Sequence, residues 1–136
     1  MGARPITVCV LVAALGLVPG CGGGGDGRKD AQQVVRDFVT AVNEKDGETF
    51  CKEITTREYV EQVTVAKGDA AVKQCETQIE QIRQPEFKLV KLVKTEVDGD
   101  RAVVTAELEQ QGRVRRQVFR MVKEDGGFRL TSGSTN

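Results

Sequence analysis

Three short turn signals divide residues 86–131 and restrict what this part of the chain can become. Asp98-Gly99, Gln111-Gly112 and Asp125-Gly126-Gly127 separate runs in which apolar and polar side chains alternate. Such alternation is typical of strands with one buried face, and a glycine at the break supplies the positive φ of a tight hairpin. The sequence therefore predicts an antiparallel meander with strands at residues 86–97, 101–110, 113–123 and 128–131.

The registers of the first two hairpins can be tested against each other. Two-residue turns at Asp98-Gly99 and Gln111-Gly112 predict the pairs Val93–Val104, Leu89–Leu108, Val104–Phe119 and Glu107–Arg116. Both registers gather apolar residues on one face: Phe87, Leu89, Val93, Ala102, Val104, Ala106, Leu108, Phe119 and Met121. A slip of one residue would scatter this set, so the agreement of the two registers supports the sheet.

The residues before the sheet follow a helical period. Asp30 can cap a first helix, Asp46-Gly47 interrupts the pattern, and Pro85 ends the last helix. The expected helices cover about residues 30–43, 50–54, 59–63 and 68–84. Helices followed by an antiparallel meander predict an α+β domain with its helices on one face of the sheet.

This order of elements resembles the cone fold of nuclear transport factor 2-like (SnoaL-like) domains, over nearly all of residues 30–131. The segments that carry the resemblance are AQQVVRDFVTAVNEKD, FCKEIT, KQCETQ and VKTEVDGDRAVVTAEL. The resemblance implies N-terminal helices packed on one face of a curved four-stranded antiparallel sheet. Cystatin-like domains share this general arrangement and are the alternative.

The beginning of the chain has the features of an export signal. Arg4 precedes the apolar run 6–18, which is shorter than the roughly 20 residues that span a bilayer. Small Gly20 stands directly before Cys21. This combination resembles the signal of a bacterial lipoprotein of the actinobacterial type, with the lipobox Val18-Pro19-Gly20-Cys21.

The resemblance implies that Cys21 is lipidated, with acyl chains such as palmitate, and becomes the mature N-terminus. The protein would then be exported and anchored to the outer face of the cell membrane, because two acyl chains hold firmly where one does not. An ordinary secretory signal, with Cys21 free, is the alternative. The expected organisation is a signal peptide (1–20), a lipidated Cys with a Gly-rich tether (21–29), an α+β domain (30–132) and a flexible tail (133–136).

The remaining cysteines predict a disulfide. Cys9 leaves with the signal peptide and Cys21 is lipidated, so Cys51 and Cys75 remain as a pair in an oxidising compartment. Cys75 lies on an apolar helical stripe, and Cys51 has apolar neighbours. A metal site would need more ligands, and a redox site usually has the closer C-x-x-C spacing. A structural disulfide is therefore expected.

The composition argues against several classes of function. Lys and Arg number 20 and so do Asp and Glu, so the chain lacks the basic footprint of a nucleic-acid-binding protein. It has no His, which removes the commonest zinc-site patterns and the side chain best suited to proton transfer near neutral pH. We expect no metal, no cofactor and no enzymatic activity. Tyr59, the only tyrosine, is interpreted as a packing residue.

Three polar residues interrupt the apolar face of the predicted sheet: Lys91, Arg115 and Gln117. Two cations and an amide inside a cone would suit an anionic ligand, because Arg matches carboxylate and phosphate geometry. Alternatively, the two cations lie at the rim with their charges in water, or pair with helix acids such as Glu58 or Glu61.

The opposite face of the sheet mixes apolar and charged residues. Val90, Leu92, Val103 and Val118 are predicted to lie there as a candidate interface, with Glu107–Arg116 and Glu96–Arg101 as ordinary cross-strand ion pairs. Domains of the resembled fold commonly dimerise through this surface. We therefore expect a membrane-anchored, non-enzymatic binding or interaction module, with a homodimer or an envelope protein as partner. A carrier or sensor of small anions is the alternative, and an enzyme of the same fold ranks last.

Overall fold

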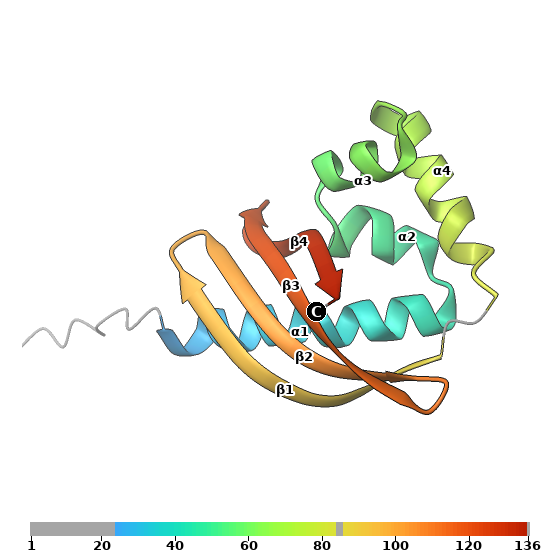
Figure 1. Cartoon of the computed structure of the whole chain (residues 1–136). Helices are drawn as coiled ribbons and strands as arrows, with labels where there is room; N and C mark the ends of the chain where they lie inside the picture. The colour runs from blue at the N-terminus through green and yellow to red at the C-terminus, as the bar shows by residue number, and fades with distance from the viewer. Residues whose placement is uncertain (1–23, 84–85, 136) are drawn as a thin grey trace, which may run out of the picture.

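The computed structural model describes residues 24–83 and 86–135, with side chains described for 27–83 and 86–132. Its helical part contains α1 (Gly24–Glu44), α2 (Gly47–Thr49), the π-helical turn η1 (Phe50–Ile54), α3 (Arg57–Thr64) and α4 (Gly68–Glu80). The strands are β1 (Phe87–Asp98), β2 (Arg101–Gln110), β3 (Arg113–Glu124) and β4 (Gly127–Thr135). They form one antiparallel sheet in the order β1-β2-β3-β4 (Figure 1). The α+β class and the meander are confirmed.

Three boundaries differ from the predictions. α1 begins at Gly24 rather than at Asp30, so the second half of the expected Gly-rich tether is helical. A Cβ placed on Gly27 would lie 3.4 Å from a methyl carbon of Val97, so this turn lies close against the sheet. Packing of this kind overrides the low helix propensity of glycine. α4 ends at Glu80 rather than near residue 84. Residues 133–135 were predicted as a flexible tail but are the last residues of β4, paired with β3.

The β2–β3 hairpin has the predicted register along its whole length. Val104 pairs with Phe119 and Glu107 pairs with Arg116, with no irregularity in the ladder. Arg116 also donates a hydrogen bond to Glu107 at 3.1 Å, as expected for this cross-strand pair. The apolar inner-facing residues of β2 are all buried: Ala102, Val104, Ala106 and Leu108.

The β1–β2 hairpin departs from the predicted register near its turn. Asp98 pairs with Arg101, so the turn residues are Gly99 and Asp100, one position later than predicted. The ladder then contains two irregularities, between Leu89 and Lys91 and between Leu92 and Lys94. The expected pair Leu89–Leu108 is present, but Val104 lies opposite Thr95 and not Val93. The predicted pair Val93–Val104 is therefore wrong.

A repeat of three residues explains the two bulges. Residues 88–94 read KLVKLVK. Each Lys pairs with a residue on the outer face of β2, each Leu pairs with an inner-facing residue, and each Val occupies the bulge. The bulged valines are exposed, Val90 by 46% and Val93 by 36%. Each bulge contains one extra residue that takes no part in the alternation. When the two valines are left out, the Lys and Leu residues alternate between the two faces, as a sheet requires. The extra residues also bend the strand.

The core lies between the sheet and α1, which runs along the concave face of the sheet (Figure 1). Phe38 of α1 occupies the centre of this space. Its ring centroid lies 5.7 Å from that of Phe50, 6.5 Å from that of Phe87 and 5.2 Å from that of Phe119. Aromatic rings at these separations attract one another beyond their buried area. This cluster joins α1, η1, β1 and β3 into a single core.

The two ends of α1 are tied to opposite ends of β1. Near the beginning of the helix, Gln32 donates a hydrogen bond to the Thr95 hydroxyl at 3.0 Å. At its end, the Asn43 side chain donates to the Phe87 carbonyl at 2.7 Å and accepts from the Phe87 N–H at 2.8 Å. The amide of Asn43 therefore replaces a strand partner at the first residue of β1.

The small helices form a second layer, held together by covalent and close contacts. Cys51 of η1 is joined by a disulfide to Cys75 of α4, as predicted. Gly47 is buried where α2 meets α4, and a Cβ there would lie 2.7 Å from the Glu76 carbonyl oxygen. The residue that the sequence marked as a helix break is thus required for a close approach of two helices. No helix in the described part of the chain has the length and apolarity needed to cross a membrane.

Candidate functional site

The concave face of the sheet is filled with side chains. Phe119, Met121 and Val104 are each at most 2% exposed, and Phe38 packs over Phe119. The space in which the sequence placed an anion site is occupied by this apolar core. A ligand there would have to displace close-packed side chains, which costs several kcal/mol of packing energy in a typical core, at about 2–5 kcal/mol per large side chain removed.

The three residues predicted for that site do not converge. Lys91 pairs with Glu107 on the outer face of the sheet, because the bulge at Val90 shifts the alternation of β1. Arg115 and Gln117 do share the inner face of β3, opposite Leu108 and Ala106. Arg115 is nevertheless exposed, and Gln117 is half-buried. The structure therefore separates Lys91 from the other two residues.

The alternative, in which these cations pair with helix acids, is also not observed. Glu61 accepts a hydrogen bond from the Gly68 N–H at 3.0 Å and forms an ion pair with Lys67 at 3.2 Å. These contacts close the loop between α3 and α4, and they lower the pKa of Glu61, the Gly68 hydrogen bond most of all. Glu58 accepts from Gln62 on its own helix. Tyr59 is half-buried on α3, and its N–H donates to the hydroxyl of Thr56.

The outer face of the sheet retains three of the four predicted interface residues. Val103 and Val118 are half-buried there, and Val90 is exposed at its bulge. Leu92 is a correction, because it pairs with inner-facing Ala106 and packs against the core. The expected pair Glu96–Arg101 is also not formed, since Glu96 pairs with Val103 and its carboxylate contacts Lys94 at 2.8 Å.

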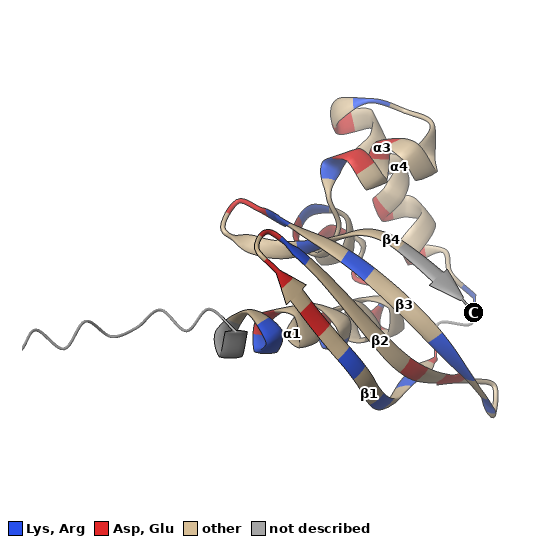
Figure 2. Ribbon diagram, turned by 60° about the vertical axis from the view of Figure 1, so that its left-hand side comes forward, with Lys and Arg blue, Asp and Glu red and all other residues tan. Residues whose placement is uncertain are grey.

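Charged side chains surround the valines of this face. Figure 2 shows basic and acidic segments along β1, β2 and β3, with α1 behind the sheet. The row Lys91–Glu107–Arg116 crosses three neighbouring strands, so its charges alternate in sign. The outer face thus combines partly exposed apolar residues with charges that alternate in sign across the strands.

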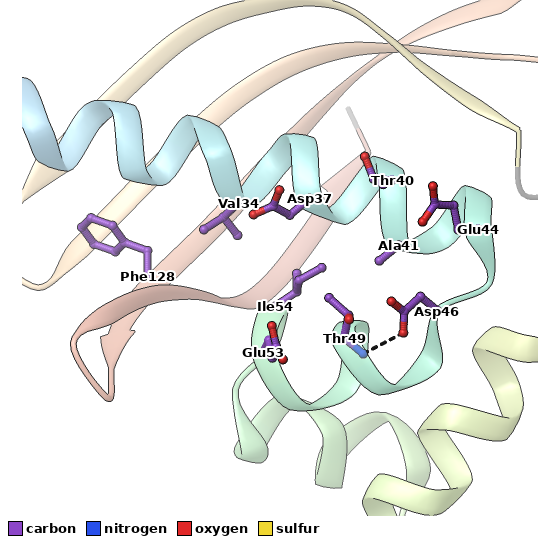
Figure 3. A pocket seen from close by; sticks show the side chains of 10 residues that line it. All are labelled: Val34, Asp37, Thr40, Ala41, Glu44, Asp46, Thr49, Glu53, Ile54 and Phe128. Atoms are coloured by element: carbon purple, nitrogen blue, oxygen red, sulfur yellow. Dashed lines mark hydrogen bonds between the residues drawn. The ribbon is translucent and has the colours of Figure 1, made fainter.

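A groove with a volume of about 420 Å³ lies on the opposite side of α1, against η1 (Figure 3). Its apolar lining comes from Val34, Ala41, Ile54 and Phe128, and its carboxylates are Asp37, Glu44, Asp46 and Glu53. The sequence does not indicate this groove, because its residues come from four elements and no local spacing unites them.

The best-defined carboxylate in the groove has a structural task. Asp46 caps α2 and accepts a hydrogen bond from the Thr49 N–H at 3.0 Å (Figure 3). The backbone N–H and the hydroxyl of Thr49 hold the pKa of Asp46 below its ordinary value of 3.8. Asp37 accepts from Gln33 of its own helix. The described residues contain no group of three or more His, Cys, Asp or Glu side chains that would hold a metal ion.

A second hollow, of about 640 Å³, lies between η1 and the β3–β4 turn. Three cations line it, Lys52, Arg57 and Arg129, and the first and last of them are already engaged. Lys52 forms ion pairs of 3.1 Å with Glu48 and with Glu76, and these two carboxylates raise the pKa of Lys52. Arg129 donates to the Lys52 carbonyl at 2.6 Å and lies 3.7 Å from Glu124. The contact of Arg129 with the Lys52 carbonyl connects β4 to η1.

Comparison with known proteins assigns the chain to a family. The model of the family described as "Domain of unknown function (DUF4878)" matches residues 20–131. The chain belongs to this family. No curated protein sequence matches it significantly.

Solved structures show the same fold at low sequence identity. A de novo designed protein with a curved β-sheet is 21% identical, with a TM-score of 0.52, covering 78% of this chain and 98% of its own. A variant of the protein Rd1NTF2_05 is 12% identical, with a TM-score of 0.51, over 78% of this chain and 96% of its own. An NTF2-like protein of unknown function from Cytophaga hutchinsonii is 15% identical, with a TM-score of 0.46, over 77% and 87%. The two matches with TM-scores above 0.5 show that this DUF4878 domain has the fold of Rd1NTF2_05, the NTF2-like fold.

Proposed function

We propose that this DUF4878 protein is a lipid-anchored, non-enzymatic interaction module of the cell envelope, which associates through the outer face of its sheet. One observation carries the interaction part: the concave face is packed solid, whereas the outer face keeps Val103 and Val118 only half-buried. In a fold with a filled cone, the outer face offers apolar area for a partner.

A second copy is the partner that the charge pattern favours. Glu107 and Arg116 are neighbours on β2 and β3. If two sheets pack face to face about a two-fold axis that runs between β2 and β3, Glu107 of one copy lies over Arg116 of the partner, and the reverse. A closed two-fold interface requires such self-complementarity, and opposed charges at its edge favour the correct register.

The association is tested by sedimentation of the full-length chain in a neutral detergent. We expect a dimer for the wild type and a monomer for V103K/V118K, because the same two-fold axis places Val103 over the partner's Arg120, where a lysine adds like-charge repulsion. The control V63K/V65K changes two exposed valines at the end of α3, 46% and 93% exposed, and should remain dimeric. Equal masses for the wild type and V103K/V118K, with both folded by circular dichroism, would remove the proposed interface.

The anchoring part is supported by the lipobox-like sequence at residues 18–21 and by the Cys51–Cys75 disulfide, which is typical of exported proteins. Cys21 lies outside the described residues. Metabolic labelling with an alkyne fatty acid should mark the wild type and not C21S, and C21S should move from the membrane to the soluble exported fraction. A C9S variant serves as the control. Labelling that persists in C21S would contradict the anchor.

A further inference from the structure

The groove between α1 and the α2–η1 segment combines an apolar floor with acidic edges (Figure 3). Three residues of its floor, Ala41, Ile54 and Phe128, are each at most 4% exposed. Its volume of about 420 Å³ lies within the range of small-molecule sites, about 300–1,000 Å³. Among the described residues that line it, none is Lys or Arg. The groove therefore suits a ligand that is both apolar and positively charged.

The carboxylates of the groove lie as one pair at each of its ends. Asp37 and Glu44 are seven residues apart on α1, which is about 10 Å along the helix axis. Asp46 and Glu53 of the other wall are also seven residues apart. The chain reverses between the two walls at Lys45, where φ is 57°. Glu44 therefore lies at the same end as Asp46, and the other pair lies toward the opposite end (Figure 3).

The protein itself does not neutralise these carboxylates. Within the described part of the chain, the side chains of Glu44 and Glu53 form no hydrogen bond or ion pair. Asp37 accepts only from a neutral amide on its own helix. The neighbouring lysines in the sequence, Lys45 and Lys52, form no ion pair with the four groove carboxylates. Like charges around one groove repel one another. One carboxylate at each end is therefore free to receive a cationic group.

We propose that this groove binds a linear aliphatic diamine or polyamine. Its ammonium groups donate hydrogen bonds to the carboxylates at the two ends, and its methylene chain covers the apolar floor. A single metal ion is a poorer match, because carboxylates about 10 Å apart cannot both reach an ion at about 2.0–2.6 Å. The proposal depends neither on the lipid anchor nor on the dimer, whose valines lie on the outer face of the sheet.

The exposure of the groove predicts weak and rapidly reversible binding. Thr40, Glu44 and Glu53 are exposed at its edges. Ion pairs in such positions are screened by water and salt and contribute little each. The amine is therefore lost during purification, and titration rather than retention of a ligand is the appropriate measurement.

The test is a titration of the isotope-labelled full-length chain in a neutral detergent, followed through its amide signals in NMR spectra. Diaminooctane, with an amino group at each end of its chain, should shift the signals of residues 34–54 and of Phe128. The affinity should fall as salt is added. Diaminopropane carries the same charge but is too short to reach both ends. It should bind about fivefold more weakly, the contribution of one exposed ion pair.

A pair of double variants locates the site. E44Q/E53Q removes one carboxylate at each end and should weaken the binding of diaminooctane by about tenfold. Its spectrum should otherwise match that of the wild type, because neither side chain has an internal contact. The matched control E58Q/D69N removes the same charge from exposed sites on α3 and α4, which do not line the groove. It should change the affinity by less than about twofold.

Several outcomes would overturn the proposal. Equal affinities for diaminooctane and diaminopropane would show that the distance between the two ends has no role. Equal losses in E44Q/E53Q and E58Q/D69N would show that only net charge matters. Shifts in the groove with Mg²⁺ but not with diaminooctane would replace the amine by a metal ion. Binding of a Lys-rich peptide without binding of diaminooctane would replace it by a protein segment.

Discussion

The two faces of the sheet are made from the same strands but serve different purposes. On the concave face, Phe119 and Val104 are completely covered by α1 and by Phe38. On the convex face, Val118 and Val103 stand one residue away in the sequence and remain half-exposed among charges. The comparison teaches that the cone of this domain is a core and not a pocket. This difference is the basis for the proposed association through the outside of the sheet.

The largest expected effect comes from the centre of the concave face. Phe119→Ala should lower the free energy of unfolding by about 3–5 kcal/mol, because it leaves a cavity under Phe38. Val118→Ala, the next residue on the other face, should cost about 1 kcal/mol or less. Urea unfolding of both variants measures the difference. Similar losses of unfolding free energy in the two variants would contradict the difference in burial between the two faces.

The helical side of the core is held by the disulfide, which should have the next largest effect. C51A/C75A opens a loop with a sequence separation of 24 residues. In the chain-entropy model this removes about 3 kcal/mol of stability. Thermal unfolding of the wild type with and without a reducing agent should give the same difference as the double variant. An unchanged melting temperature in both comparisons would contradict a structural role.

The bulges of β1 can be tested by a pair of adjacent substitutions. Leu92→Lys should lower the free energy of unfolding by about 2 kcal/mol, because a side chain packed against the core becomes charged. Val93→Lys should change it by less than about 0.5 kcal/mol, because Val93 is exposed at its bulge. Unbroken alternation from the Asp98-Gly99 turn predicts the reverse order. If Val93→Lys lowers the free energy of unfolding more than Leu92→Lys, the uninterrupted register predicted from the sequence is correct and the bulges are absent.

The smallest expected effect is a dependence on pH from two half-buried carboxylates. Hydrogen bonds from Thr49 lower the pKa of Asp46 below 3.8, and those from Gly68 and Lys67 lower that of Glu61 below 4.5. A lowered folded-state pKa contributes stability above the unfolded value, and this contribution is lost as the pH falls through the folded value. Stability should therefore decline below about pH 4.5. In D46N/E61Q this decline should be less steep, and an equally steep decline would exclude these two groups as its cause.

The accuracy of the sequence-based predictions differs between the two hairpins. β3 and β2 alternate without interruption, so the turn at Gln111-Gly112 fixed their register correctly. β1 contains the repeat KLVKLVK, whose period of three belongs neither to a flat strand nor to a helix. Treating it as plain alternation placed Lys91 inside and Leu92 outside, the reverse of the structure. A period of three between strand signals is the mark that would have indicated the bulges.

The candidate sites were less predictable than the fold, because they depend on contacts between distant segments. The disulfide follows from the number of cysteines and the export signal, and it is confirmed. Phe38 fills the cone because of the way in which α1 crosses the sheet. No local pattern in the sequence specifies this crossing. The acidic groove of Figure 3 likewise arises only when α1, α2, η1 and β4 are assembled, and the close approach at Gly47 only when α2 meets α4. The arginines of β3 were visible in the sequence, but their exposure at the end of the sheet was not.

The most direct test of a filled cone and an associating outer face is native mass spectrometry of the full-length, oxidised chain released from detergent micelles. The account predicts twice the mass of a single chain, with no small molecule retained after the detergent is removed. A single chain that carries a small anionic adduct would contradict it, because the account predicts both association and the absence of a retained ligand.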